Sequence, residues 1–235
     1  MSAMLRLSAL LIVSAALVLA APSGAGTGVR HVLLGRSVEG RAIVAVEVGD
    51  PHAKRKVLVV GCIHGNETAG IAIARHLERT ALPVGLDLWI VESLNPDGQA
   101  AGTRDNARGV DLNRNFPWGW RPLEGVFDSG PRALSEPESR IVYRLILRLK
   151  PGVSIWFHQS LNVVDLSGGW SAVERRFAAL AGLRVRVLPR YPGSVTTWEN
   201  HALPGTTAFV VELPAGQPTA ARTARYARAA LAVSG

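Results

Sequence analysis

A histidine and a glutamate three residues apart lie where a predicted strand meets a predicted helix. The stretch GCIHGNETAG contains His64 and Glu67, follows the apolar run KVLVV, and precedes IAIARHLER, which has helical spacing. Side chains at positions i and i+3 around a helix start can meet, so an imidazole nitrogen and a carboxylate oxygen can reach one cation. An ordinary helix start can also hold such a pair, so the spacing alone leaves both interpretations open.

Three ionisable residues follow short apolar runs that have the composition of strands. His64 follows the run at residues 56–62, His158 follows VSIWF, and Glu212 follows AFVV. In an open α/β sheet, ligands and reactive groups gather beyond the carboxyl ends of the strands. His158 would complete a His2Glu set with the first pair, which is a donor set of catalytic zinc sites. Taken alone, a histidine after an apolar strand is more often a structural residue.

The segment GTRDNARGVDLNRNFP, residues 102–117, combines arginines with asparagines and has few apolar residues. It contains Arg104, Asn106, Arg108, Asn113, Arg114 and Asn115. A guanidinium group matches the geometry of a carboxylate, and an asparagine amide can add a donor beside it. The composition indicates a segment that captures a terminal carboxylate and that supplies a cation near a polarised carbonyl. A hydrogen-bonded loop with solvated arginines is the alternative.

A β-α-β order would position these residues. Residues 31–48 are typical of a β-hairpin, and residues 56–62 and 86–92 are typical of strands, with a helix over residues 71–80 between them. The strand at 57–60 is apolar almost throughout, which favours a sheet that is covered by helices on both faces. We therefore predict an α/β fold.

The middle of the chain holds a long turn-rich segment and then a helix start. A segment as long as residues 93–132 inside a compact domain is usually functional or disordered, and its embedded aromatic residues make disorder the poorer option. SEPE follows, with Ser135 predicted as the N-cap and Glu138 as its capping-box partner. Strands at 153–157 and 208–211 and helices at 171–180 and 219–232 complete the prediction.

The 235-residue chain is long enough for one domain with a substantial core. Its first 27 residues contain Arg6, the apolar run ALLIVSAALVLAA and then small residues, which is typical of a secretory signal followed by a short linker. The apolar run is shorter than the roughly 20 residues that span a bilayer, and no later segment is suitable, so no lasting membrane span is expected. Cys62 is the only cysteine, so no internal disulfide forms, and we interpret it as a small apolar filler rather than a ligand or nucleophile.

The chain is basic, with 26 Lys and Arg residues against 18 Asp and Glu residues. A basic exported protein is attracted to polyanions such as those of a cell envelope. No helix-turn-helix, zinc finger or aromatic-plus-basic groove is recognisable, so we do not expect nucleic acid as a partner. The positive residues are spread along the chain, which favours a solvated surface.

Several motifs occur in an order that resembles a known family. GRSVEGR, HGNE, NPDG, Arg104 with Asn106, GVDLNRNFP, SEPE, Phe157 with His158, and VELP follow one another along the chain. This series resembles the zinc carboxypeptidases of the carboxypeptidase A type, and more closely their short bacterial branch that includes murein-tripeptide amidases. The resemblance implies one catalytic domain over residues 28–235, with a mixed, twisted β-sheet flanked by helices on both faces.

The resemblance also implies roles for the metal and for the catalytic residues. His64, Glu67 and His158 match the ligands of one Zn2+ ion. Glu212 matches the carboxylate that takes a proton from the zinc-activated water and passes it to the leaving amine. Arg104 matches the arginine that polarises the scissile carbonyl. These roles agree with the general chemistry of metal, proton-transfer and electrostatic catalysis.

Four further residues match positions that contact the substrate in the family. Asn113 and Arg114 match the pair that holds the free carboxylate of a peptide or murein peptide. Tyr191 is a candidate for the mobile tyrosine over the substrate, although the loop that carries it is short. Val195 falls where the family selects the terminal side chain, and an apolar residue there argues against a preference for basic C-termini.

The main hypothesis is an exported or periplasmic zinc hydrolase that removes a C-terminal or diaminopimelate-type residue from a peptide, and we expect it to be a monomer. A deacylase of N-acyl amino acids, of the succinylglutamate desuccinylase or aspartoacylase type, is the nearest alternative. GVDLNRNF and VEL suit the carboxypeptidase branch better. A non-enzymatic envelope-binding protein is the alternative from another class.

Overall fold

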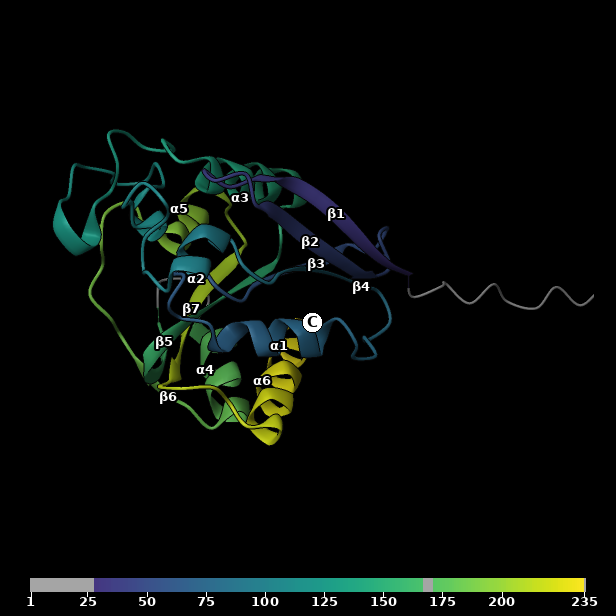
Figure 1. The fold of residues 1–235 in the computed structure, drawn as a ribbon. Helices are drawn as coiled ribbons and strands as arrows, with labels where there is room; N and C mark the ends of the chain where they lie inside the picture. Colours follow the sequence, from purple (N-terminus) through teal and green to yellow (C-terminus); the bar gives the residue numbers. More distant parts are fainter. Residues whose placement is uncertain (1–27, 167–170, 235) are drawn as a thin grey trace, which may run out of the picture.

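A mixed β-sheet forms the centre of the molecule. The computed structural model describes residues 28–166 and 171–234, and within these residues seven strands form one sheet in the order β1-β2-β4-β3-β5-β6, with β7 paired to β5 (Figure 1). The predicted signal and linker, residues 1–27, lie outside the described residues. The strands are β1 (Gly28–Arg36), β2 (Ala42–Gly49), β3 (Arg55–Val60), β4 (Leu86–Val91), β5 (Val153–Asp165), β6 (Arg184–Arg186) and β7 (Thr207–Pro214).

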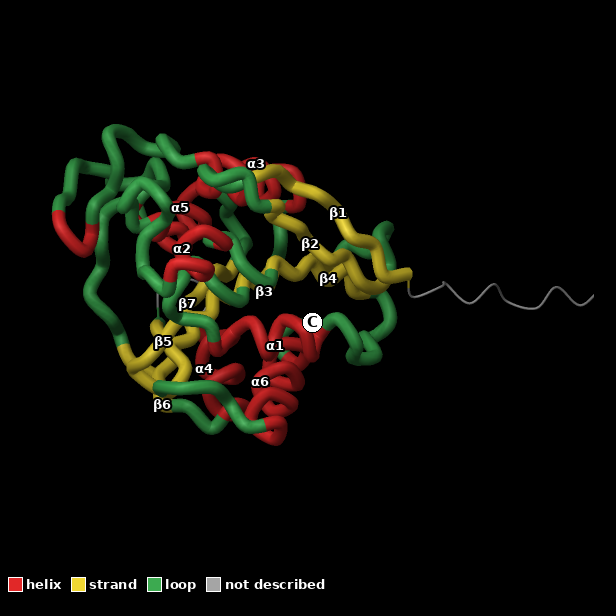
Figure 2. Tube along the Cα trace, viewed as in Figure 1, coloured by secondary structure: helices red, strands yellow, loops and turns green. Residues whose placement is uncertain are grey.

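Helices cover both faces of this sheet, as predicted (Figure 2). One face packs against α1 (Ala69–Leu77), α4 (Ser171–Ala181) and α6 (Ala220–Ala232), and the other packs against α3 (Pro137–Leu149) and α5 (Val195–Ala202). Strand β3 supplies both cores, because Val57 and Val59 face the first and Leu58 and Val60 face the second. The alternation of side chains along a strand explains why this run is apolar at every position.

Parallel pairing brings several strand ends to one edge of the sheet. Strand β3 runs parallel to β4 and β5, and β5 runs parallel to β7, whereas β1 and β2 form an antiparallel pair. The carboxyl ends of β3, β5 and β7 therefore lie together at one edge, where Figure 1 also places the loops that lead to α2 (Pro96–Ala101) and α5. This edge carries the predicted site residues.

The predicted capping box at the start of α3 is wrong. Glu136, not Ser135, is the N-cap residue, and its side chain makes no capping hydrogen bond. The carboxylates are used elsewhere: Glu136 Oε2 accepts a hydrogen bond from Asn106, and Glu138 Oε1 accepts one from the backbone N–H of Val38. The SEPE motif therefore holds the arginine- and asparagine-rich loop and the β1–β2 turn against α3.

Local sequence patterns also missed several short elements and the end of one strand. Helix α2 begins inside the NPDG turn, where Asn95 Oδ1 accepts a hydrogen bond from Gly98 N and caps the helix. Helix α5 and two 3-10 turns, Leu112–Arg114 and Gly125–Phe127, had no strong periodic signal. Strand β5 continues to Asp165, well beyond the predicted end at Phe157. No helix in the described part of the chain is long and apolar enough to cross a membrane.

Candidate active site

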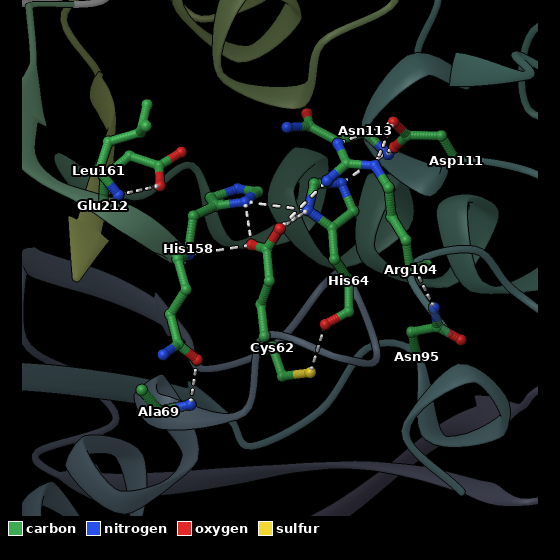
Figure 3. A network of polar contacts seen from close by, with 12 residues as sticks. Cys62, His64, Ala69, Asn95, Arg104, Asp111, Asn113, His158, Leu161 and Glu212 are labelled. Atoms are coloured by element: carbon green, nitrogen blue, oxygen red, sulfur yellow. Dashed lines mark hydrogen bonds and ion pairs between the residues drawn. The ribbon is translucent and has the colours of Figure 1, made fainter. Parts of the chain in front are cut away.

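Three side chains converge at the shared strand edge. His64 and Glu67 lie in the turn between β3 and α1, and His158 lies on β5. Glu67 contacts both histidines at 3.0 Å, with Oε1 facing His64 Nδ1 and Oε2 facing His158 Nδ1, and the two Nδ1 atoms are 3.1 Å apart (Figure 3). The structure therefore brings together the three residues predicted as metal ligands.

The turn that carries His64 is fixed by close backbone packing. A Cβ atom on Gly65 would lie 2.0 Å from the carbonyl carbon of Gly98 in α2, so only glycine fits there. Cys62 is fully buried, and its Sγ donates a hydrogen bond to His64 O over 3.1 Å. Burial raises the pKa of the Cys62 thiol to about 12, so it stays protonated. Cys62 supports the turn and is not a member of the metal-binding group.

Asp111 orients the His64 ring, and the sequence analysis did not single it out. His64 Nε2 lies 3.0 Å from Asp111 Oδ1, and Asp111 is fully buried. Burial alone would raise the pKa of Asp111, but the neighbouring His64, Arg114 and Arg104 lower it well below its usual range. An ionised Asp111 accepts a hydrogen bond from the Nε2–H group, which leaves Nδ1 of His64 as the nitrogen available to a metal ion. The only sequence signal was an acidic residue in the GVDLNRNFP motif.

The donor set fits a zinc ion. Ligand atoms of His64, Glu67 and His158 all lie within 4.8 Å of one another. Burial alone would raise the pKa of Glu67, but the two imidazoles lower it far below its usual range, so the carboxylate is ionised. Two nitrogens and a carboxylate are a typical catalytic zinc set that leaves a position open.

Arg104 lies directly beside this group. Its Nε and Nη2 contact Asp111 Oδ2 at 3.2 and 3.0 Å, and its Nη1 contacts Glu67 Oε1 at 3.1 Å. The side chain is about a quarter exposed and faces the cavity described below. Asp111 and Glu67 thus hold the Arg104 guanidinium in place beside the metal-binding group. There its positive charge can stabilise negative charge on a substrate oxygen.

Asn113 and Arg114 occupy the 3-10 turn that follows Asp111. Asn113 Oδ1 accepts a hydrogen bond from Val195 N at 3.0 Å, which ties this turn to α5. Arg114 is 5% exposed, and burial lowers the pKa of its guanidinium, although Asp111 opposes that effect. Arg114 Nε has no hydrogen-bond partner in the described part of the chain. A guanidinium group on the wall of a cavity is suited to bind an anionic group of a ligand.

Tyr191 lies at this site as expected, whereas Val195 does not. The guanidinium carbon of Arg114 lies 4.2 Å from the centre of the Tyr191 ring, which is 38% exposed and lines the cavity. The Val195 side chain is fully buried in the core between the sheet, α3 and α5, and it is not part of the cavity wall. The prediction that Val195 contacts the terminal side chain is therefore corrected, because the start of α5 turns it inward. Thr196 and Thr197 line the cavity instead.

Glu212 lies on β7 beside the metal-binding group. It is in register with His158 on the neighbouring strand β5, and its Oε2 accepts a hydrogen bond from Leu161 N over 3.4 Å (Figure 3). The side chain is half-buried and faces the same cavity. A carboxylate in this position can exchange protons with water and with a bound substrate.

One cavity of about 330 Å³ connects these residues. Its wall includes all the predicted site residues except Val195, together with several that the sequence analysis did not single out: Phe127, Gln159, Ser160, Leu161, Asp165, Leu188, Pro189, Arg190, Ser194, Thr196, Thr197 and Val210. Most of the second group come from the extended end of β5 and from the segment between β6 and α5. These segments had irregular sequence patterns, so no periodicity placed them at the site.

The fold and the site define a zinc carboxypeptidase-like protein. A model of the zinc carboxypeptidase family matches residues 26–175, and the chain belongs to this family. Murein peptide amidase A of Escherichia coli K12 is 32% identical over 146 residues, which cover 56% of this chain and 60% of that protein. Murein peptide amidase A of Vibrio campbellii is 32% identical over 197 residues, with 77% of each chain covered.

Solved structures agree with this family. The crystal structure of a murein-tripeptide amidase from Escherichia coli O157 superposes with a TM-score of 0.72 at 26% identity and covers 87% of this chain and 91% of that one. Carboxypeptidase A of Helicoverpa armigera superposes with a TM-score of 0.75 over 88% of this chain and 69% of that one, at 18% identity. These matches confirm the predicted α/β fold.

Proposed function

We propose that this protein is an exported, zinc-dependent carboxypeptidase that hydrolyses the bond before a C-terminal residue. The observation that carries the proposal is the convergence of His64, Glu67 and His158 in a cavity that also contains Glu212 and Arg114. This arrangement combines a metal-binding group, a proton carrier and a buried cation for a carboxylate. The relatives include murein peptide amidases, which supports a peptide or murein peptide with a free carboxylate as the substrate of this protein.

Arg114 and Asn113 set the position of the substrate in this proposal. The buried Arg114 guanidinium binds the terminal carboxylate, and Asn113, whose side chain is anchored by the backbone of Val195, adds its amide group. Tyr191 stacks beside Arg114 and shields the carboxylate from water. Holding the substrate by its end places the preceding bond near the metal-binding group and accounts for cleavage at a C-terminus.

Arg104 and Glu212 act on the bond that breaks. Arg104 donates hydrogen bonds to the scissile carbonyl oxygen and stabilises the negative charge that develops on it. Glu212 accepts a proton from the attacking water on a carboxylate oxygen and delivers it to the leaving nitrogen. Zinc, when bound by the three ligands, supplies a Lewis acid and lowers the pKa of water in the site. The cavity is large enough for a terminal residue and its neighbouring bond.

Export and the oligomeric state extend the proposal to the whole protein. Arg6 and the apolar run that follows it support secretion or a periplasmic location through an N-terminal signal. The Arg114 and Glu212 side chains of one chain line a single cavity, so one chain supplies the proposed site and a monomer is sufficient for activity.

A hydrolysis panel tests the proposed function. Purified protein is given peptides with aliphatic, aromatic and basic C-termini, murein tripeptide, and N-acyl amino acids, each with and without a zinc chelator. We expect release of a C-terminal residue that stops on chelation and returns with added zinc. Hydrolysis of N-acyl amino acids alone would instead indicate a deacylase. Cell-wall binding that survives chelation, without any hydrolysis, would indicate a binding protein.

A further inference from the structure

A second cavity lies at the edge of the sheet opposite the candidate active site. Its volume is about 530 Å³, within the roughly 300–1,000 Å³ of small-molecule sites. Lys56 near the start of β3, Val153 at the start of β5 and Thr207 at the start of β7 line it. These strands are parallel, so their amino ends meet here and their carboxyl ends meet at the active site. Strand β3 has six residues at about 3.3 Å each, which separates the two sites by about 20 Å.

All the charged residues on the wall of the second cavity are basic. No acidic residue of the described ranges is part of this wall, which contains Lys54, Arg55, Lys56 and Arg176. Among these four, only Lys56 forms an ion pair within the described ranges, with its Nζ 2.8 Å from Asp87 Oδ2. Arg55 Nε donates a hydrogen bond to the neutral carbonyl of Gly85 over 3.1 Å. Three of the four positive charges are therefore not neutralised by a carboxylate of the described residues.

The fold assembles this group of charges from distant parts of the chain. Lys54 and Arg55 lie at the start of β3, whereas Arg176 lies in α4. Arg175 is also exposed on α4 but does not line the cavity. Like charges around one cavity repel each other, and a bound anion removes that cost. The second cavity therefore differs from the evenly spread basic surface that the sequence indicates.

Small and apolar residues form most of the remaining wall. Val173 in the first turn of α4 and Val233 after the end of α6 line the cavity together with Val153. Ser234 also lies there, but its Oγ donates a hydrogen bond to Ala230 O and so caps the end of α6. A ligand in this cavity thus meets an apolar surface beside a group of cations.

We propose that the second cavity binds a phosphate monoester whose other end is apolar. Such an ester carries a charge of about −1.5 to −2 at pH 7 and has three acceptor oxygens, so it balances the unpaired cations better than a singly charged carboxylate. The planar guanidinium of Arg176 matches a pair of phosphate oxygens. The apolar end packs against the valines of the wall, where it is removed from water. This binding is independent of the proposed hydrolysis.

Ligands that differ in one feature test the proposal. Isothermal titration calorimetry of the purified, zinc-loaded protein compares octyl phosphate, methyl phosphate and octanoate, each below its micelle concentration. Octyl phosphate should have a Kd at least about tenfold below either of the others, which corresponds to about 1.4 kcal/mol. Methyl phosphate lacks the apolar end, and octanoate has one charge. Comparable binding of methyl phosphate or octanoate, or no binding of octyl phosphate, would overturn the proposal.

Two neighbouring arginines of α4 test where the ligand binds. Arg176→Gln removes a cation from the cavity wall and should raise the Kd for octyl phosphate about fivefold or more, since it removes a charged hydrogen-bond donor. Arg175→Gln is the matched control, because it removes the same charge from the same helix outside the cavity, and its Kd should equal that of the wild type. An unchanged Kd in Arg176→Gln, or equal weakening in both variants, would overturn the proposal.

The candidate active site also holds a cation, so the titration is repeated with Arg114→Met. Binding of octyl phosphate should be undiminished, because Arg114 lines the other cavity. Loss of binding would place the ligand in the active site and overturn the proposal. Neither result depends on whether the protein hydrolyses peptides.

Vesicles distinguish two sources of the phosphate ester. Wild type and Arg176→Gln are sedimented with phosphatidylcholine vesicles that contain phosphatidic acid. Binding that depends on Arg176 would identify the ligand as a lipid head group, whereas binding of octyl phosphate without vesicle binding would identify it as a soluble ester. Both results support the second cavity as a phosphate ester site.

Discussion

His158 and Glu212 are directly opposite each other on the neighbouring parallel strands β5 and β7. One is a metal-ligand candidate and the other is the candidate proton carrier, so a single pair in the strand register sets the spacing between metal and base. The two strands pair over most of their length, which makes this spacing a property of the sheet rather than of a flexible loop.

Replacing Glu212 with glutamine should separate metal binding from turnover. Glu212 is not among the metal-binding residues, so Glu212→Gln should retain zinc at the wild-type stoichiometry. Loss of the proton carrier should lower kcat by about 10²–10⁴-fold. Steady-state kinetics and metal analysis on the same preparation measure both quantities. Wild-type turnover in this variant would remove Glu212 from the mechanism.

Replacing Asp111 with asparagine should weaken zinc binding although Asp111 does not touch the metal. Asp111 holds the His64 ring through Nε2 and also pairs with Arg104. Loss of such an outer carboxylate typically costs about 10–100-fold in metal affinity. Competition with a chromophoric chelator measures the zinc Kd. Asp87→Asn serves as the control, because it removes a buried carboxylate that pairs with Lys56 and is not part of the cavity wall. An unchanged Kd in Asp111→Asn would show that His64 is oriented by other contacts.

Replacing Arg114 should remove the requirement for a free C-terminus. Wild-type protein should hydrolyse a peptide acid much faster than the same peptide as a C-terminal amide, because the buried guanidinium needs an anionic partner. In Arg114→Met the acid-to-amide ratio of kcat/KM should fall by about 30-fold or more, the effect of losing one partner of a buried charge pair. Comparing the two substrates within each variant corrects for changes in folding. An unaltered ratio would place the carboxylate elsewhere.

Glu199 should make the protein less stable as the pH rises. Glu199 is fully buried in α5, and burial raises its pKa from 4.5 to about 7, although the hydrogen bond from Ser154 opposes this shift. Between these two values the unfolded chain releases a proton that the folded protein keeps, so the free energy of unfolding falls by about 3 kcal/mol and then levels off. Below about pH 4.5 the residue is neutral in both states and contributes no pH dependence.

Chemical denaturation at pH 5 and pH 8 measures this effect. Glu199→Gln keeps a hydrogen-bond acceptor for Ser154 but cannot ionise, so it should lose less stability than the wild type between the two pH values. The same pH dependence in both proteins would show that other groups dominate. Glu92→Gln is a suitable control, because it removes a carboxylate that pairs with Arg75 at the surface.

The sequence was sufficient for the parts of the structure that follow simple periodic patterns. The apolar run of β3 and the hairpin of β1 and β2 were predicted, because side-chain alternation and burial on two faces leave a direct trace in composition. The ends of β3, β5 and β7 also indicated where His64, His158 and Glu212 would lie. Their convergence needed the parallel pairing of strands that are far apart in the chain, and no local pattern reports that pairing.

The remaining site residues depend on contacts that the sequence does not show. Asp111 and Asp165 are acidic residues outside the strands and helices predicted from the sequence, and only the folded chain places one behind His64 and the other on the cavity wall. Val195 was assigned to the substrate from its position in a motif, whereas the first turn of α5 directs it into the core. Motif position identified the segment correctly, but the direction of a side chain depends on the helix geometry.

Metal analysis of wild type and Glu67→Ala tests the central claim most directly. Both proteins are loaded with zinc, freed of excess metal and analysed by inductively coupled plasma mass spectrometry, with Glu92→Gln as a control for the loss of a glutamate. The account predicts one zinc per chain in the wild type and the control, and little zinc in Glu67→Ala. Absence of zinc from the wild type, or a full equivalent in Glu67→Ala, would contradict it.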